Sequence, residues 1–386
     1  MIPLWGQQRA GFNFDFGASL PSGWTFTRAS SGTYLPTAAT LATASTDVAR
    51  FDTLGYLNEP AATNLLLRSQ LVGGTLWAVA FNNAGFAVNT NNAVAPDGTT
   101  TATQCIAQSV GAAQYSINAQ QVTSTAAGYS RAIWLKGAVG GETVYFMSTL
   151  GTSSYTKTTC VLTTSWQRFK LENVTETAVG WWTYIGVDRR DGTQADPGAI
   201  TYYVWQAGDE LGTFTTSDIV TVGSTATRAA DNLTYTLSQL PALQTAAGYG
   251  VAIDFSLLGA SQNANVVIGL SAVSGFTDTI YVSLNASGQV IITSVVGGSG
   301  VSGAATNLNS IGSTNKLAIG VTPAGLRYSI NGAAVVAVVN AGQPTMTTAA
   351  VGRASWAASN YAGMHATRVT LYPGPQSDAA LIARAT

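Results

Sequence analysis

Residues 129–135 read Tyr-Ser-Arg-Ala-Ile-Trp-Leu, and this stretch is typical of the segments that decide the fold class. Apolar residues alternate along it, and β-branched and aromatic types dominate, which predicts a β-strand with one face in a core. Similar stretches recur, each bounded by Gly, Asn, Asp, Ser or Pro. The further strands expected are Thr143–Met147, Ile200–Trp205, Gly250–Phe255, Val266–Leu270, Thr279–Leu284, Val290–Val295, Lys316–Val321, Arg327–Ile330 and Val335–Val339.

Turn signals separate these stretches. Asn331-Gly332 stands between two of them and predicts a type I′ hairpin turn. Helical patterns are nearly absent, and the clearest is residues 376–384, where Ser377 is placed to cap a short terminal helix. We therefore expect an all-β protein built from antiparallel β-sandwiches of the jelly-roll or lectin-like kind.

The composition excludes several classes of protein. Charged residues are 9% of the 386, against roughly 25% in an average soluble protein, and 17 Lys and Arg against 18 Asp and Glu give a net charge of −1. Without a basic field there is nothing to neutralise phosphates, so we expect no nucleic-acid partner. The hydrophobic fraction of 46% argues against disorder.

Membrane, export and metal signals are weak. The longest apolar runs, such as Ala333–Val339, are far shorter than the ~18 residues of a membrane span, so no membrane insertion is expected. The first residues lack a basic stretch followed by an apolar core, which argues against a secretory signal. One histidine, His365, argues against His-rich zinc sites and a His-based triad. Cys105 and Cys160 are expected to be reduced and buried, with a disulfide as the alternative.

Composition shifts along the chain predict three parts. Residues 1–60 look irregular, because Gly and Pro interrupt aromatic clusters. Residues 61–237 are expected to form one large sandwich, residues 238–248 a connector, and residues 249–386 a second sandwich rich in Val, Ile, Gly and Ser. The first sandwich holds six of the nine tryptophans, namely Trp77, Trp134, Trp166, Trp181, Trp182 and Trp205.

Three groups of motifs resemble known families. The first resembles a module common in tailed-phage structural proteins, and its motifs are Phe26-Thr-Arg-Ala-Ser30, Val48-Ala-Arg-Phe-Asp52, Leu57-Asn-Glu-Pro-Ala61 and Thr63-Asn-Leu-Leu. The second is similar to a carbohydrate-binding-module jelly roll found in phage tail fibres and spikes. Its motifs are Ala95-Pro-Asp-Gly-Thr99, Ser130-Arg-Ala-Ile-Trp-Leu-Lys136, Trp166-Gln-Arg168, Trp205-Gln-Ala-Gly208, Thr216-Ser217 and Thr225-Ala-Thr-Arg-Ala-Ala-Asp231.

The third group covers residues 249–384 and is similar to concanavalin/laminin-G-like sandwiches, including Arg368-Val-Thr-Leu-Tyr372 before the terminal helix. Together these resemblances imply a non-enzymatic virion protein, a spike or fibre subunit made in the host cytoplasm. They imply that residues 1–60 attach it to other virion structural proteins and that its sandwiches bind host cell-surface polysaccharide. A homo-oligomer, in particular a trimer, is also implied.

Two aromatic groups are candidate sugar platforms, because pyranose C–H faces bind to exposed aromatic rings on rigid scaffolds. In Trp181-Trp182-Thr-Tyr184, neighbouring side chains of a strand point to opposite faces, so one Trp is expected in the core and one on the surface. Burial of both under a loop is the alternative. Tyr203 is expected opposite the face that Tyr202 and Val204 share, with a core role as its alternative.

Acidic residues suggest a weaker site. Asp188, Asp191 and Asp196 are candidate ligands of a structural calcium ion, the one cofactor considered, and a charged turn neutralised by neighbouring arginines is the alternative. Asp209-Glu210 is expected in a solvated loop.

Catalytic patterns are poor. A glycosidase needs two carboxylates about 5–10 Å apart across a cleft, but many acids here stand in turns. There is no Gly-x-Ser-x-Gly elbow. Residues 297–303 are expected to form a flexible loop, and His365 is assigned no role. The leading hypothesis is thus a glycan-binding virion protein. A purely structural decoration or joining protein is the alternative, and a polysaccharide depolymerase comes third.

Overall fold

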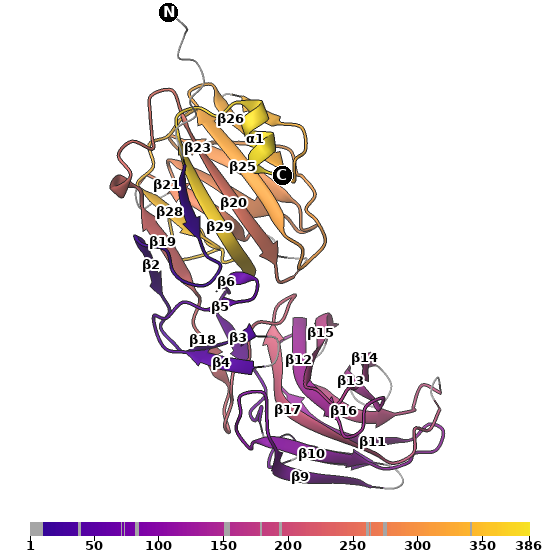
Figure 1. Ribbon diagram of the computed structural model, residues 1–386. Helices are drawn as coiled ribbons and strands as arrows, with labels where there is room; N and C mark the ends of the chain where they lie inside the picture. Colours follow the sequence, from indigo (N-terminus) through magenta and orange to yellow (C-terminus); the bar gives the residue numbers. More distant parts are fainter. Residues whose placement is uncertain are drawn as a thin grey trace, which may run out of the picture. The chain divides into compact units, whose positions relative to one another are not determined.

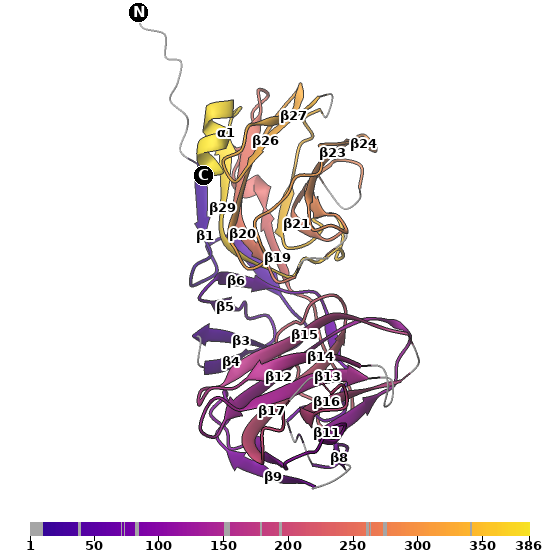
Figure 2. The same cartoon turned by 90° about the vertical axis from the view of Figure 1, so that its right-hand side faces the viewer.

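The computed structural model describes residues 11–37, 40–70, 72, 74–81, 85–149, 155–177, 180–192, 195–259, 262, 264–272, 276–339 and 342–386. The chain is almost entirely β-structure, as predicted, and all pairings between named strands in these residues are antiparallel (Figures 1 and 2). It divides into two compact units. Unit 1 contains residues up to Ser31, 44–60 and 229–386, and unit 2 contains residues 32–43 and 61–228.

Unit 2 is a sandwich of a seven-stranded and a five-stranded sheet. The seven-stranded sheet consists of β15 (Gln167–Glu176), β12 (Ala127–Gly137), β17 (Ile200–Leu211), β10 (Ala102–Ala107) and β9 (Phe86–Ala93), with β7 (Ala62–Asn64) and β18 (Ala226–Arg228) attached. The five-stranded sheet runs in the order β14 (Tyr155–Val161), β13 (Thr143–Thr149), β16 (Trp181–Asp188), β11 (Tyr115–Val122) and β8 (Ala78–Phe81). A short hairpin, β3 (Gly32–Thr37) and β4 (Thr40–Ala44), forms a separate sheet.

Strand periodicity builds the core of unit 2. In β12, Tyr129, Ile133 and Leu135 are buried in the cluster that fills the space between the two sheets. Val144 and Phe146 of β13 enter the same cluster from the five-stranded sheet. Each of these sheets therefore has one face in the core and one face directed away from it.

Unit 1 is a second sandwich, of an eight-stranded and a seven-stranded sheet. The eight-stranded sheet runs β27 (Val336–Val339), β26 (Gly325–Ile330), β25 (Asn315–Thr322), β20 (Tyr249–Leu257), β29 (Met364–Pro373), β6 (Gly55–Asn58) and β5 (Phe51–Asp52), with β1 (Phe12–Asp15) also paired to β29. The seven-stranded sheet runs β2 (Trp24–Thr27), β19 (Asn232–Thr236), β28 (Thr348–Val351), β21 (Val266–Ser271), β22 (Thr279–Leu284), β23 (Val290–Val296) and β24 (Ser299–Ser302).

These units differ from the domain boundaries expected from composition. Residues 11–31 and 44–60 are not a separate irregular segment, because β1, β2 and β6 pair with strands of the C-terminal half and β5 pairs with β6. Figure 2 shows β1 beside β29. Residues 1–10 of the expected attachment segment lie outside the described residues. The expected connector belongs to unit 1, where a 3-10 helix, η1 (Leu237–Gln239), is followed by the buried Leu243.

Local predictions hold at several points. All ten expected strands are present, and Asn331 and Gly332 both have positive φ, at 51° and 72°, in a turn closed by Ala333 N donating to Ile330 O at 2.9 Å. The terminal helix, α1 (Asp378–Arg384), has Ser377 as its N-cap and lies against β25 and β26 (Figure 1). Both cysteines are free and buried, as expected.

Two expectations for unit 1 need correction or detail. Residues 297–303 are not a flexible loop: Gly297 and Gly298, at φ of 57° and 83°, make the tight turn between β23 and β24. Their missing side chains permit this positive-φ pair. His365 is buried, and its Nε2 lies 2.7 Å from Asp52 Oδ2.

Among the described residues, no helix is long and apolar enough to span a bilayer.

Candidate functional site

The tryptophan pair of β16 divides between the two faces of its sheet. Trp181 is fully buried, packs on Tyr129 with ring centroids 4.3 Å apart, and donates from Nε1 to Asp209 Oδ2 at 2.8 Å. Trp182 points the other way and is partly exposed. The expected division between core and surface is therefore confirmed, and Trp181, a candidate platform, is not accessible to a ligand.

A small cluster surrounds Trp182 on the side of the five-stranded sheet directed away from the core. We call it the β16 face, and it consists of Tyr115, Ile117, Ala119, Tyr145, Met147, Trp182 and Tyr184. Tyr115 and Trp182 are partly exposed, and the other five side chains are buried. The rings of Trp182 and Tyr184 are stacked, with centroids 6.2 Å apart and planes inclined by 18°. Tyr184 is 8% exposed, so the accessible part of this stack is Trp182. Burial raises the pKa of the Tyr184 phenol.

Two ion pairs border the β16 face. Arg190 Nε lies 3.0 and 2.9 Å from the two carboxylate oxygens of Asp188, and its guanidinium lies 4.5 Å from the Tyr115 ring centroid. Lys157 pairs with Asp191 and lies 4.9 Å from the Tyr145 ring centroid. Cations over ring faces are attracted by the ring quadrupole, so these pairs hold the aromatic side chains in place. Asp188 and Asp191 of the predicted acidic turn thus border the face that holds Trp182 and Tyr184.

Tyr203 lies elsewhere. It belongs to β17 in the seven-stranded sheet, is partly exposed, and has Lys136 Nζ 4.8 Å from its ring centroid. Tyr202 and Val204 are buried in the core of unit 2, which confirms that Tyr203 opposes them. The β16 face and Tyr203 are therefore on the outward faces of two different sheets, and the four aromatic candidates do not form one site.

The three calcium candidates do not form a metal site. Asp188 is paired with Arg190, Asp191 with Lys157, and Asp196 accepts hydrogen bonds from Gly198 N at 3.0 Å and Val110 N at 3.2 Å. In the part of the chain that the structure describes, no group of three or more His, Cys, Asp or Glu side chains could hold a metal ion. The charged-turn alternative describes these residues better.

Asp209 and Glu210 are not in a solvated loop, and that expectation is wrong. Both are buried in β17 and diverge, as an extended segment requires. Asp209 Oδ2 accepts from Arg131 Nε at 2.9 Å as well as from Trp181, and so compensates a charge buried in β12. Glu210 accepts from the backbone N of Thr216 at 3.1 Å and from its hydroxyl at 2.8 Å. Burial raises the pKa of Glu210 to about 7.

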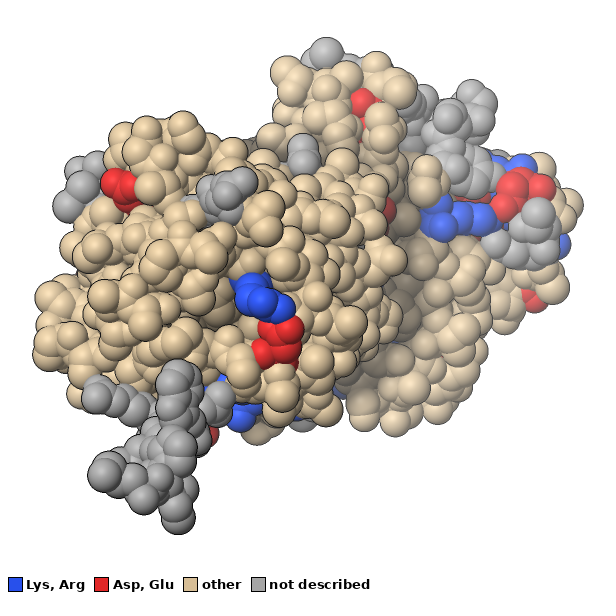
Figure 3. Space-filling view, turned by 90° about the horizontal axis from the view of Figure 1, so that it is seen from above, with Lys and Arg blue, Asp and Glu red and all other residues tan. Residues whose placement is uncertain are grey.

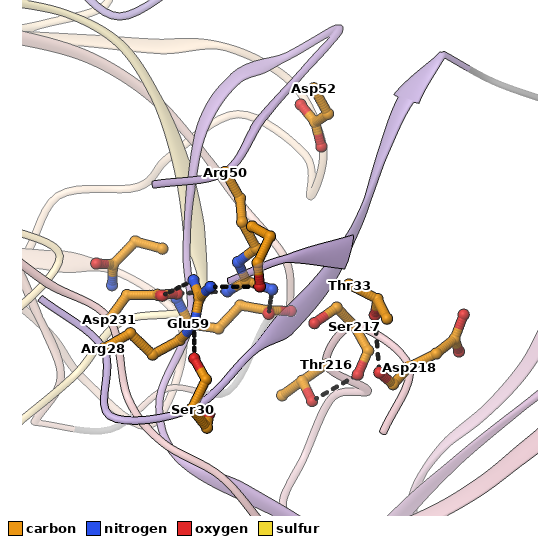
Figure 4. A network of polar contacts seen from close by, with 12 residues as sticks. Arg28, Ser30, Thr33, Arg50, Asp52, Glu59, Thr216, Ser217, Asp218 and Asp231 are labelled. Carbon is orange, nitrogen blue, oxygen red and sulfur yellow. Dashed lines mark hydrogen bonds and ion pairs between the residues drawn. The ribbon is translucent and has the colours of Figure 1, made fainter. Parts of the chain in front are cut away.

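Three of the motifs that resemble a phage module meet inside unit 1, together with Asp231 from the carbohydrate-binding-module-like group. Asp231 accepts from Arg28 Nη1 at 3.0 Å, from Arg50, and from Glu59 N at 2.8 Å, and Arg50 also pairs with Glu59 at 2.7 Å. All four side chains are buried, and Figure 4 shows them converging from separate segments. Burial alone would lower the pKa of Arg50, but Glu59 and Asp231 raise it overall. These motif residues stabilise the fold and are not placed at a ligand site.

Unit 1 also has a neutral pocket of about 200 Å³, formed by residues 287–289 and 307–311 with Leu257 and Asn315. Its amides bind one another: Gln289 Nε2 donates to Asn307 Oδ1 at 2.9 Å, and Asn309 N donates to Asn315 Oδ1 at 2.8 Å. Much of its hydrogen-bonding capacity is therefore already used within the protein.

Comparison with known proteins gives similarity of fold only. No protein-family model matches the chain, and no curated protein matches it. Among solved structures, the carbohydrate-binding module CBM40 of the Ruminococcus gnavus IT-sialidase matches with a TM-score of 0.32 and 14% identity, over 40% of this chain and 93% of that one. The module TmCBM61, solved with β-1,4-galactotriose, matches with a TM-score of 0.29 and 14% identity, over 38% and 97%.

The sialidase NanB, known from Streptococcus pneumoniae, matches with a TM-score of 0.31 and 15% identity over 38% of this chain. The matched part spans only 25% of the NanB chain. Likenesses this distant carry no argument about what this chain binds or catalyses.

Proposed function

We propose that this chain is a non-enzymatic spike or fibre subunit of a phage or phage-like particle, and that it binds host-surface glycans through the β16 face of unit 2. The observation that carries the glycan part is Trp182, a partly exposed indole stacked on Tyr184 on the outward face of a rigid sheet. The virion part is supported by the motif resemblance in residues 26–67 and 225–231 alone.

The chemistry of the β16 face suits a sugar. A pyranose ring presents C–H groups to an aromatic face and hydroxyls at its edge, so it needs an indole or phenol surrounded by polar groups. Trp182 supplies the ring, while Arg190, Lys157 and Asp191 supply charged donors and an acceptor at the border. Asp188 is buried and holds Arg190 in place. Each of the two cations has a carboxylate partner, so the border of the β16 face has little net charge. Such a border suits uncharged sugar hydroxyls.

The wider surface supports weak recognition by many copies. On the face shown in Figure 3 most of the visible surface belongs to uncharged residues, and the blue group near the centre lies against a red one. We expect each site to bind weakly and the particle to gain avidity from many copies of the chain, which needs no new contact at any one site. The proposal includes a homo-oligomer, in particular a trimer, which rests on the resemblance to fibre proteins.

The test is binding of the full chain to oligosaccharides prepared from host capsule and lipopolysaccharide, on an array and then by calorimetry. Trp182→Ala should weaken binding at least tenfold, because it removes the central ring of the site. Tyr203→Ala is the matched control, since it removes a partly exposed ring from the other sheet of the same unit and should leave binding unchanged. Unchanged binding by Trp182→Ala, or no binding by the wild type, would reject the proposal.

The virion part has its own test. Antibodies against the chain should label the surface of the particle in immuno-electron microscopy, and labelling without any glycan binding would favour the purely structural alternative. A depolymerase would release reducing sugar from host polysaccharide, and none is expected. The buried Asp209 and Asp231 are engaged with arginines, which leaves them unsuited to protonating a glycosidic bond.

A further inference from the structure

Unit 1 carries a second group of exposed rings, which the sequence patterns did not single out. Phe276 is 46% exposed, and Tyr281 and Trp356 are partly exposed. The ring centroids of Tyr281 and Trp356 are 4.9 Å apart, and Phe276 lies 5.1 Å from Trp356 and 5.8 Å from Tyr281. We call these three side chains the Trp356 cluster.

The strand pattern explains why Tyr281 faces away from the core. Its neighbours in β22, Ile280 and Val282, are buried in the core of unit 1, so Tyr281 points to the opposite side of the sheet. Gly269 of β21 is its partner in register. A Cβ at Gly269 would come within 3.0 Å of the backbone N of Ser355, so the absent side chain lets the segment before Trp356 cross the sheet at this point.

Polar groups beside the rings are suited to hydroxyls. Within the described part of the chain, neither Trp356 Nε1 nor Tyr281 Oη makes a hydrogen bond. Continuing the row from Tyr281 across the sheet, Thr293 of β23 and Ser302 of β24 follow in register, with their hydroxyl oxygens 2.8 Å apart. Thr293 is buried and Ser302 is exposed, so Ser302 presents the accessible hydroxyl, held by Thr293. The rings and this hydroxyl form an amphipathic strip.

Charge complementarity identifies the occupant. Arg353 stands three residues before Trp356. Its guanidinium donates hydrogen bonds to Ala354 O at 2.8 Å, Asn232 Oδ1 at 2.6 Å and Ala357 O at 3.1 Å. Asp278 Oδ1 accepts from Gly297 N at 2.9 Å. Arg353 and Asp278 are the charged residues nearest to the three rings in sequence, and they carry opposite charges, so together they give the strip no net charge that would favour an anionic or a cationic ligand.

We propose that the Trp356 cluster, together with Thr293 and Ser302, is a second glycan site, specific for a neutral pyranose. The sugar's C–H face lies on the rings, and its hydroxyls bond to Trp356 Nε1, Tyr281 Oη and the Ser302 hydroxyl, which Thr293 positions. This inference rests on the proposed function, because it assumes that the chain binds glycans. It adds a separate site, in unit 1. One chain then binds two sugars, and linked sites raise avidity without strengthening either contact.

The experiment titrates the full chain with neutral cello-, galacto- and manno-oligosaccharides and with sialylated oligosaccharides, by saturation-transfer NMR and calorimetry. Trp356→Ala should weaken binding of a neutral oligosaccharide at least tenfold. Trp356→Phe keeps a ring but removes the N–H donor, and it should weaken binding severalfold without disturbing the fold. Val339→Ala, which trims a 67% exposed side chain of the same unit, is the control and should have no effect.

The outcomes separate the two sites. Binding that Trp356→Ala weakens and Trp182→Ala does not supports the Trp356 cluster and leaves the β16 face without support. Binding that Trp182→Ala weakens and Trp356→Ala and Trp356→Phe leave intact overturns the inference while the proposed function stands. Tighter binding of sialylated than of neutral oligosaccharide at the Trp356 cluster also overturns the inference, because its surface would then not be selective for a neutral sugar.

Discussion

Replacing Asp231 by Asn should strongly destabilise unit 1. The substitution keeps the size of the side chain but removes the charge that compensates Arg28 and Arg50, which are both fully buried. The substitution also replaces one carboxylate oxygen, which accepts a hydrogen bond from an arginine, by an amide NH2 group, which cannot accept one. Of the carboxylates in this network, only Glu59 then remains beside two guanidinium groups.

The magnitude follows from the burial. Breaking a buried ion pair by removing one partner costs about 3–5 kcal/mol, because the other charge stays buried without compensation. For a unit of this size each kcal/mol lowers Tm by about 2–4 °C, so a fall of roughly 6–20 °C is expected.

The assay is urea unfolding followed by circular dichroism, together with calorimetry for Tm. Asp378→Asn is the matched control, because Asp378 pairs with Arg327 at the surface of the same unit and both side chains are nearly half exposed. That pair should contribute at most about 1 kcal/mol. The reasoning fails if Asp231→Asn changes the free energy of unfolding by less than about 1 kcal/mol, or if the control costs as much.

Three further predictions concern unit 2. Burial raises the pKa of Glu210 from 4.5 to about 7, so the folded state holds this proton more tightly than the unfolded state does. The free energy of unfolding should therefore fall by about 3 kcal/mol as pH rises from 4.5 to 7. Glu210→Gln should reduce this pH dependence in urea unfolding, and an unchanged pH dependence would refute the assignment. Burial also raises the pKa of Cys160 to about 12 and that of Cys105 further, so a thiol reagent at pH 8 should label neither in the native protein and both in urea, whereas rapid native labelling would contradict their burial. Trp181→Ala should lower the free energy of unfolding by about 3–5 kcal/mol, whereas Trp182→Ala should lower it by less than about 1 kcal/mol. Equal decreases in denaturant unfolding would show that both rings are core residues.

Local pattern predicted local structure well. Alternation located β12, β17 and β20, and it assigned Trp181 and Trp182 to opposite faces, because side-chain direction in a strand depends only on position along it. The cap at Ser377 likewise depends on nearby backbone groups. Such features need no knowledge of distant segments.

Long-range pairing was not predictable in the same way. Residues 11–31 and 44–60 looked irregular because β1, β2 and β6 pair with strands far later in the sequence, in β29 and β19. Asp209 and Glu210 looked solvated because Arg131 and Trp181 approach Asp209 only in the folded sandwich. Arg131, in the middle of the apolar strand β12, was the signal in the sequence that buried carboxylates should be sought, because a buried cation requires a carboxylate partner.

The pairing of β1 with β29 also sets the order in which the chain becomes native during synthesis. Phe12 pairs with Leu371, so at about 5–20 residues per second the ribosome needs roughly 20–70 s to deliver the partner of a strand it made near the start. All of unit 2 emerges within that interval and has its own core ready to form. Until β29 is made, the aromatic strand β1 has no partner strand, so the nascent protein is most vulnerable to aggregation in that interval.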